Sequence, residues 1–226
     1  MEPNKTTYHQ QAYEFTKSQI LNLKLKPGQY ILDTDIAAQL NVSRTPVREA
    51  FHRLEQEGLL VYEARRGWRV YALTLEDIHE IFDLKELVEG MVVRKAAYCQ
   101  RLPEFAPRLE AVMKELRIAA ELEDVEVWLR ADAALHELFF EMAGNDRAAS
   151  LIRGLNEQWH RLRIGFTVRK ERMKRSAVEH EQVVRSVLAG NGEQAEVQLR
   201  RHLNNVRNEL VELLVNMVIP FARDGI

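Results

Sequence analysis

The feature that most constrains this chain is a pair of short helical patterns separated by the turn Asn41-Val42. Residues 33–40 and 44–54 each predict a helix, because apolar side chains recur in both at the spacing of one helix face. The apolar positions are Ile36, Ala37, Leu40, Val47, Ala50, Phe51 and Leu54. Two short helices joined in this way predict a helix-turn-helix.

The start of the second helix carries side chains suited to DNA. Ser43 is a candidate N-cap, and Pro46 fits the first turn, where its missing N–H costs little. Arg44, Thr45 and Arg48 lie on or near the face opposite the apolar one. Arginine reads guanine edges, threonine reaches phosphate or a thymine methyl, and a helix N-terminus attracts phosphate. The alternative is an ordinary surface helix with two solvated arginines.

A hairpin with a basic tip follows the second helix. Residues 59–62 and 69–71 are strand candidates, and residues 63–68 form the tip between them. Such a hairpin is a wing that can lie along a phosphate backbone or a minor groove. The candidate DNA contacts in it are Arg65, Arg66 and Gly67.

Several motifs in this region occur in a familiar order. They are Pro27-Gly28, the run Val42–Ala50, the run Arg53–Leu59, and Arg66-Gly67. Together they resemble the winged helix-turn-helix domain of GntR-type transcriptional regulators. The resemblance implies a regulator and not an enzyme, with a palindromic double-stranded DNA operator as its partner.

Length and charge are consistent with a DNA-binding head on a second domain. The chain has 226 residues, enough for two modest domains, which we expect at residues 1–73 and 74–226. Residues 1–72 carry ten basic and eight acidic side chains, whereas the whole chain has a net charge of -2. One such head would bind DNA weakly at physiological salt, so we expect a homodimer with two heads.

Several other classes of protein do not fit the sequence. Cys99 is the only cysteine, which excludes an intramolecular disulfide and a cysteine-rich zinc site. No apolar run approaches the length of a membrane span, and the N-terminus has no signal-peptide core. We therefore expect a cytoplasmic protein with no membrane partner.

The second domain is predicted to be entirely helical. Thr74 precedes two acidic residues and is a candidate cap for a long helix, and no convincing strand follows it. Five or six helical segments are expected, which would form an antiparallel bundle, so the fold class is mainly α. The breaks between the segments are Leu102-Pro103, Leu122–Asp124, Gly144-Asn145, Lys170–Arg175 and Gly190–Gly192.

Histidines are the residues of chemical interest in this bundle. Asp132 and His136 stand four apart, which places them on one helix face, and His180 and His202 lie on two later helices. One carboxylate and three imidazoles could meet in the core and bind Zn²⁺, Ni²⁺, Co²⁺ or Mn²⁺. The alternative is a set of unrelated surface or hydrogen-bonded histidines.

The same residues carry a second resemblance. Asp132 and His136, then Met142–Asn145, Glu179-His180 and His202 resemble the FCD effector domain of the FadR-like subfamily of GntR regulators. The resemblance implies one divalent metal ion per chain, bound by the aspartate and the three histidines. It also implies a small carboxylate effector that completes the coordination of the ion. His160 lies outside this motif.

Two cations are candidates for binding the effector. Lys85 occupies a place where similar proteins often have an arginine, and Arg163 lies on the helix after Asn145. Surface salt bridging is the alternative for both. The same cluster could instead serve a metal sensor or a hydrolase-like metalloenzyme, for which Glu137 or Glu141 would have to act as general acid or base. The hydrolase reading leaves the winged head unexplained.

Overall fold

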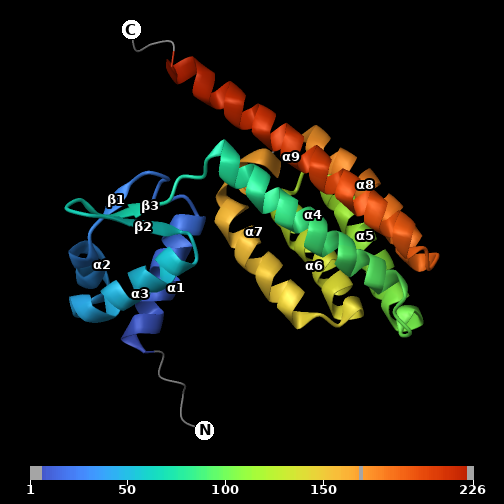
Figure 1. Cartoon of the computed structure of the whole chain (residues 1–226), viewed down its shortest axis with the longest axis horizontal. Coiled ribbons are helices and arrows are strands. Elements are labelled where there is room, and N and C mark those ends of the chain that lie inside the picture. Colours follow the sequence, from blue (N-terminus) through green and yellow to red (C-terminus); the bar gives the residue numbers. More distant parts are fainter. Residues whose placement is uncertain (1–6, 168–169, 223–226) are drawn as a thin grey trace. The chain divides into compact units, whose positions relative to one another are not determined.

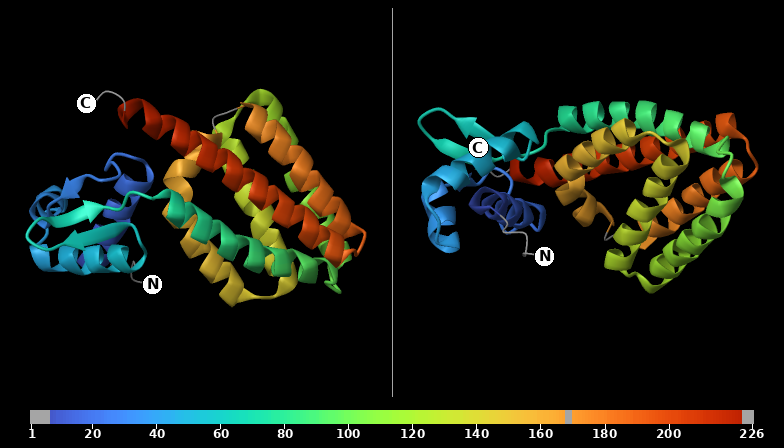
Figure 2. Two further views of the ribbon diagram at one scale, coloured as in Figure 1. Left: turned by 45° about the horizontal axis from the view of Figure 1, so that its top comes forward. Right: turned by 90° about the horizontal axis from the view of Figure 1, so that it is seen from below.

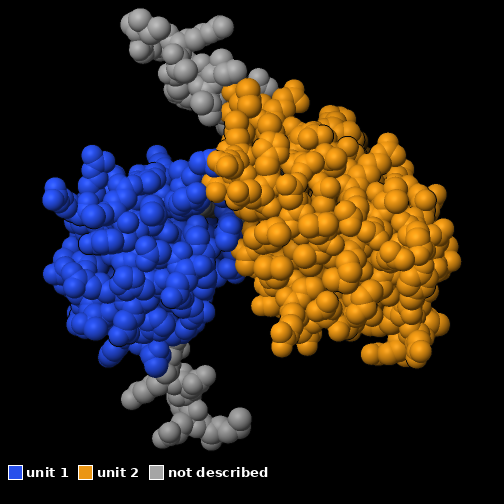
Figure 3. All heavy atoms as spheres, in the orientation of Figure 1, with its two compact units in different colours: residues 1–74, 157–161 blue, residues 75–156, 162–226 orange. Residues whose placement is uncertain are grey.

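The computed structural model describes residues 7–167 and 170–222, except for the side chains of residues 159–167, 170, 213 and 216–222. The chain divides into two compact units (Figure 3). The first comprises Met1–Thr74 with Glu157–Arg161, and the second comprises Leu75–Asn156 with Leu162–Ile226. Both are mainly helical, which confirms the predicted fold class.

The first unit is a winged helix-turn-helix (Figure 1). Its three strands form an antiparallel sheet in the order β1-β3-β2, with Tyr30 opposite Arg69 and Tyr62 opposite Trp68. The elements are α1 (Tyr8–Leu21), β1 (Tyr30–Ile31), α2 (Asp33–Leu40), α3 (Arg44–Gln56), β2 (Leu60–Glu63) and β3 (Gly67–Val70).

The apolar face of α3 forms the centre of this unit's core. Phe51 and Leu54 are fully buried, as is Ile20 of α1, and the edge of the Phe51 ring meets Trp68 of β3 at 5.6 Å between centroids. Burying a side chain of this size contributes about 1.5–3 kcal/mol relative to leaving it in water. The spacing of Val47, Phe51 and Leu54 thus turns the opposite face of α3 toward solvent.

The turn between α2 and α3 depends on Asn41. Its φ of 53° lies in the left-handed region, which asparagine tolerates better than most residues. The N–H of Val42 then donates to the carbonyl of Ala37 at 3.0 Å and closes the end of α2. Ser43 occupies the N-cap of α3, but the predicted hydrogen bond from the helix N-terminus to its hydroxyl is absent. Ser43 is exposed, so water can satisfy those N–H groups.

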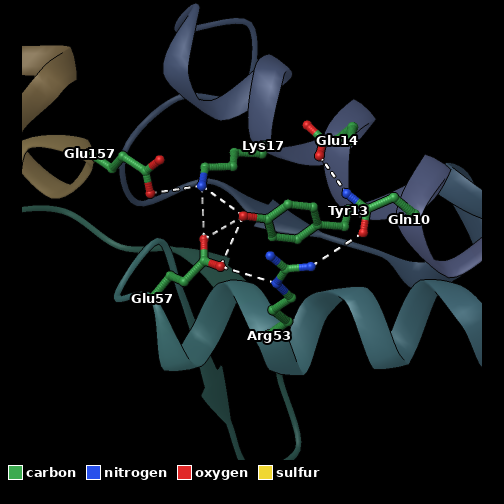
Figure 4. A network of polar contacts seen from close by, with 7 residues as sticks. All are labelled: Gln10, Tyr13, Glu14, Lys17, Arg53, Glu57 and Glu157. Atoms are coloured by element: carbon green, nitrogen blue, oxygen red, sulfur yellow. Dashed lines mark hydrogen bonds and ion pairs between the residues drawn. The ribbon is translucent and has the colours of Figure 1, made fainter. Parts of the chain in front are cut away.

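A polar network joins α1 to α3 (Figure 4). Glu57 accepts hydrogen bonds from the Tyr13 hydroxyl at 2.9 Å, from Lys17 at 3.0 Å and from Arg53 at 3.2 Å. The guanidinium of Arg53 lies over the Tyr13 ring, 3.7 Å from its centroid. The network therefore holds α1 against α3 beside their shared apolar core.

Three details of the first unit differ from the sequence-based prediction. Strand β1 was not predicted, and β2 and β3 are shifted by one or two residues from the expected ranges. The apolar spacing of residues 8–23 predicts a helix over that range, but α1 ends at Leu21, because Leu23 has a φ of 58° that a helix does not accept. None of these shifts changes the order of the elements.

The second unit is a bundle of six helices over the described residues. Most of them end close to the predicted breaks; Gly144, for example, caps α6 with a φ of 59°. The stretch Lys170–Arg175, predicted as a break, is instead helical and begins α8. Helix α4 begins directly after Thr74. The helices are α4 (Leu75–Ala97), α5 (Leu102–Leu122), α6 (Val125–Ala143), α7 (Asp146–Thr167), α8 (Lys170–Leu188) and α9 (Gly192–Ala222).

Helices α4 and α9 run antiparallel along each other (Figure 2). Arg94, near the end of α4, pairs with Glu193 at the start of α9 at 3.0 Å, and Asp83 pairs with Arg207 at 2.7 Å. Helix α5 packs on α6, and α8 packs on both α5 and α9. Among the described residues, no helix is long and apolar enough to cross a membrane.

Candidate functional site

The solvent face of α3 presents the predicted DNA-reading residues. Ser43, Arg44, Thr45 and Arg48 are all exposed, at or near the N-terminal end of the helix. More than half of the side chain is accessible at both arginines. This combination of a helix N-terminus, hydroxyls and guanidinium groups is suited to base edges and phosphates.

Asp33 links the two arginines, a role that we did not predict from the sequence. Its carboxylate accepts from Nε of Arg44 at 3.2 Å and from Nε of Arg48 at 2.5 Å. Burial alone would raise the pKa of Asp33, but the hydrogen bonds from Arg48 and Arg44 outweigh it and lower the pKa. The carboxylate therefore stays ionised and orients both guanidinium groups. The signal in the sequence was an acidic residue at the start of α2.

The wing tip exposes Arg65 and Arg66. Arg65 has a φ of 69° and Gly67 a φ of 90°, so the tip turns sharply between β2 and β3. Arg66 donates to the hydroxyl of Tyr30 at 3.4 Å, and this hydroxyl donates to Glu63 at 2.5 Å. Tyr30 belongs to β1, so this strand, which the sequence pattern did not predict, helps to hold the wing in place.

In the second unit, the structure brings together three histidines from three helices. His136 of α6, His180 of α8 and His202 of α9 each offer a ligand atom, and these atoms lie within 4.8 Å of one another. Asp132, one turn before His136, has its Oδ1 atom 3.5 Å from Nε2 of His180. The four residues singled out in the sequence therefore gather in one place.

The environment of the cluster fits a metal ion. His180 is fully buried, and neither of its ring nitrogens has a hydrogen-bond partner within the described structure. An unpaired buried polar atom is costly, and a cation would satisfy it. Burial lowers the pKa of His180 well below its usual value, and it also lowers the pKa of His202. Neutral imidazoles are the form that binds a metal.

Two glutamates that the sequence did not single out as functional contact these histidines. Glu89 of α4 lies 2.6 Å from Nδ1 of His136, and Glu179 of α8 lies 2.7 Å from Nδ1 of His202. Burial alone would lower the pKa of His136, but the charge of Glu89 outweighs it and raises the pKa. The sequence separations of 47 and 23 residues left no local signal for either contact.

The structure describes the side chain of Lys85 but not that of Arg163, the two residues predicted to bind the effector. Lys85 is buried, and its amine donates to Glu89 and to Asn156, each at 2.6 Å. It therefore lies beside the histidine cluster in an ion pair and not on the surface. The side chains of Arg163 and His160 lie outside the described residues.

The carboxylates considered as general bases are engaged elsewhere. Glu137 pairs with Arg153 at 2.5 Å, and Glu141 pairs with Arg108 at 2.7 Å, both on the exposed side of α6. Neither carboxylate contacts a histidine of the cluster in any hydrogen bond or ion pair described. The geometry gives no support to a hydrolase mechanism through these residues.

Comparisons with known proteins agree with both units. Residues 9–70 match the family described as "Bacterial regulatory proteins, gntR family", and residues 80–205 match the FCD domain, which covers more than half of the chain. The chain belongs to the GntR family. Its FCD domain contains the whole histidine cluster, and its winged head contains the residues predicted to read DNA. This GntR regulator is therefore a DNA-binding transcriptional regulator of the FCD type.

Individual relatives align with nearly the whole length of the regulator. The uncharacterized HTH-type transcriptional regulator YdhC of Bacillus subtilis is 30% identical over 212 residues, covering 92% of this chain and 93% of that protein. A protein named "Probable D-xylose utilization operon transcriptional repressor", from Paenarthrobacter nicotinovorans, is 32% identical over 88% of this chain and 87% of its own length. The solved structure of McbR/YncC from E. coli has a TM-score of 0.74 at 19% identity, covering 92% of this chain and 99% of that one. That likeness shows the shared fold.

Proposed function

We propose that this regulator responds to a small organic acid held at a divalent metal ion in the FCD domain. One Zn²⁺, Ni²⁺, Co²⁺ or Mn²⁺ per chain would be bound by Asp132, His136, His180 and His202. The observation that carries the proposal is the cluster of three imidazoles, two of them buried, whose ligand atoms lie within 4.8 Å of one another. Nitrogen and carboxylate oxygen are ligands that these ions accept.

The charges around the cluster favour an anionic effector. Glu89 is paired with Lys85 at 2.6 Å, and Glu179 is paired with Arg172 at 2.9 Å. Asp132 would supply one negative charge against the two positive charges of the ion, so an anionic ligand would complete the charge balance. An octahedral ion with four protein ligands keeps two positions for other ligands, and a carboxylate can fill them.

The DNA-binding half of the proposal is a homodimer that reads a palindromic operator. Arg44 and Arg48 would make the major-groove contacts, and Arg65, Arg66 and Gly67 would lie near phosphates or the minor groove. Two heads related by a two-fold axis match a palindrome, and they supply the affinity that one weakly charged head lacks. Light scattering at micromolar concentration checks the assembly, and a monomer both with and without DNA would contradict it.

A two-step experiment tests the effector proposal. A thermal-shift screen of metallated protein against small carboxylic acids identifies ligands, because binding to the folded state raises apparent stability. The panel includes sugar acids, since one relative is named for D-xylose utilization, and D-xylose itself is added as a neutral sugar. The operator affinity is then measured with and without each hit, in metallated and in metal-stripped protein.

We expect a hit to change operator affinity by a coupling of roughly 1–3 kcal/mol, and only when the metal is present. If the metal alone produced the full change and no acid added to it, the protein would be a metal sensor. If an acid acted equally well on stripped protein, the metal-centred proposal would fail.

A further inference from the structure

We propose that Glu89 and Glu179 are positioning residues of the metal centre, each holding one ligating imidazole so that its Nε2 atom faces the ion. This inference rests on the metal part of the proposed function. It assigns a role to two carboxylates that are not themselves counted among the metal ligands.

The first observation is which ring nitrogen each carboxylate contacts. Glu89 meets His136 at Nδ1, and Glu179 meets His202 at Nδ1 as well. An ionised carboxylate only accepts hydrogen bonds, so the proton of each neutral ring must be on Nδ1. Nε2 is then the nitrogen with a free lone pair. Both rings therefore have the tautomer and the orientation that coordination needs.

The second observation is that each carboxylate is itself anchored by a buried cation. Lys85 donates to Oε1 of Glu89, while Oε2 of Glu89 meets His136. Arg172 donates to Oε2 of Glu179 at 2.9 Å, and Asn205 donates to its Oε1 at 2.8 Å. In both cases a cation donates to a carboxylate, and that carboxylate contacts an imidazole of the cluster; we call each such set of three residues a relay. The two relays begin on different helices, α4 and α8.

One of the two relays comes from a helix that carries none of the proposed ligands. Glu89 and Lys85 lie on α4, which contributes none of the four proposed ligands. A contact from α4 to His136 of α6 therefore connects a further helix to the metal centre. Lys85 was predicted to bind the effector, but its hydrogen bond to Glu89 makes it instead the residue that holds this carboxylate.

The third histidine differs from the other two. Nε2 of His180 faces Asp132, and Nδ1 has no hydrogen-bond partner within the described structure. Its ring lies nearly parallel to the ring of Trp128, with 6.4 Å between centroids. His180 is therefore held by packing, and the two carboxylate relays fix the rest of the ligand set.

A titration with Co²⁺ tests the inference, because the visible spectrum of bound Co²⁺ also reports the geometry of its ligands. Glu179 is the better first target, since Arg172 keeps Glu209 at 2.8 Å when Glu179 is replaced. We expect Glu179→Ala to weaken Co²⁺ binding about 10–100-fold and to change the spectrum. Glu179→Gln keeps an acceptor oxygen for Nδ1 and should recover part of the affinity. The same pattern is expected at Glu89: Glu89→Ala should weaken Co²⁺ binding, and Glu89→Gln should recover part of the affinity.

Glu181→Gln is the matched control. Glu181 lies on the same helix, next to His180 in the sequence, but its carboxylate pairs with Arg185 at 2.7 Å. This variant should bind Co²⁺ as wild type does. Far-ultraviolet circular dichroism and thermal melts of the metal-free proteins identify any variant that fails to fold.

The possible results distinguish a failure of this inference from a failure of the proposed function on which it rests. If wild-type protein bound no Co²⁺, the metal part of the proposed function would fail, and this inference with it. If wild type bound Co²⁺ and the folded alanine variants of Glu89 and Glu179 bound it equally well with unchanged spectra, only the positioning role would be overturned. Equal losses in the alanine and glutamine variants, without rescue, would also overturn it.

Discussion

Asp33 shows how one side chain can act on two reading residues at once. Its carboxylate accepts hydrogen bonds from both Arg44 and Arg48. Replacing Asp33 with a neutral residue therefore frees two guanidinium groups and makes the net charge of the head more positive by one. We expect Asp33→Asn to bind non-specific DNA more tightly but to lose about tenfold in its ratio of specific to non-specific affinity. Asp35→Asn, an exposed position on the same helix, makes the same charge change. Titrations of operator and scrambled DNA at several salt concentrations should therefore distinguish the two variants; identical results would refute the role of Asp33.

Because the carboxylate of Asp33 has a lowered pKa in the folded state, we expect it to make the unfolding free energy depend on pH. Burial raises the pKa of Asp33, but the two arginines outweigh it and the folded-state pKa lies below the ordinary value of 3.8. A lowered folded-state pKa contributes stability above the unfolded-state pKa, and this contribution is lost as pH falls through the folded-state value. We expect wild type to exceed Asp33→Asn in unfolding free energy at pH 7, and the gap to shrink below pH 4, about where a free aspartate protonates. Denaturant melts at pH 7 and pH 3 measure it; a constant gap would contradict the account.

At the scale of elements, α3 and the wing should contribute to DNA binding in different ways. Arg48→Ala removes a candidate base contact and should weaken operator binding by about 1–3 kcal/mol, with less effect on other sequences. Arg66→Ala removes a wing charge and should weaken binding to all sequences alike, with a flatter salt dependence. Anisotropy titrations on operator and scrambled DNA measure both. If both variants bound the operator as wild type does, the reading surface would lie elsewhere.

Elements with a strong local pattern were predictable from the sequence. Helix α2 has the expected ends because its apolar spacing stops at Asn41, a residue that tolerates a left-handed conformation. Strand β1 was not predictable in this way, since Tyr30-Ile31 is a strand only through its pairing with β3. The histidines could be selected by their spacing and by a family resemblance. The contacts of Glu89 and Glu179 could not be predicted, although Glu179 stands beside His180 in the family motif, because these contacts depend on how helices distant in sequence pack together.

At the scale of the whole molecule, both domains of the regulator are assigned on independent grounds. The winged head has its own core around α3, and the FCD bundle holds the histidine cluster. The family matches cover the two regions separately. The link between them, a change in operator affinity when the bundle is occupied, depends first on whether the bundle binds a metal ion.

The central claim is that the histidine cluster binds one metal ion per chain. Isothermal titration of Zn²⁺ into metal-stripped, untagged protein at neutral pH tests it most directly, with His180→Ala and His52→Ala as the paired variants. His180 lies in the cluster, whereas His52 is an exposed histidine of the head. We expect wild type and His52→Ala to bind one ion per chain, and His180→Ala, still folded by circular dichroism, to lose tight binding. No stoichiometric binding by wild type, or equal binding by His180→Ala, would contradict the metal-centred account.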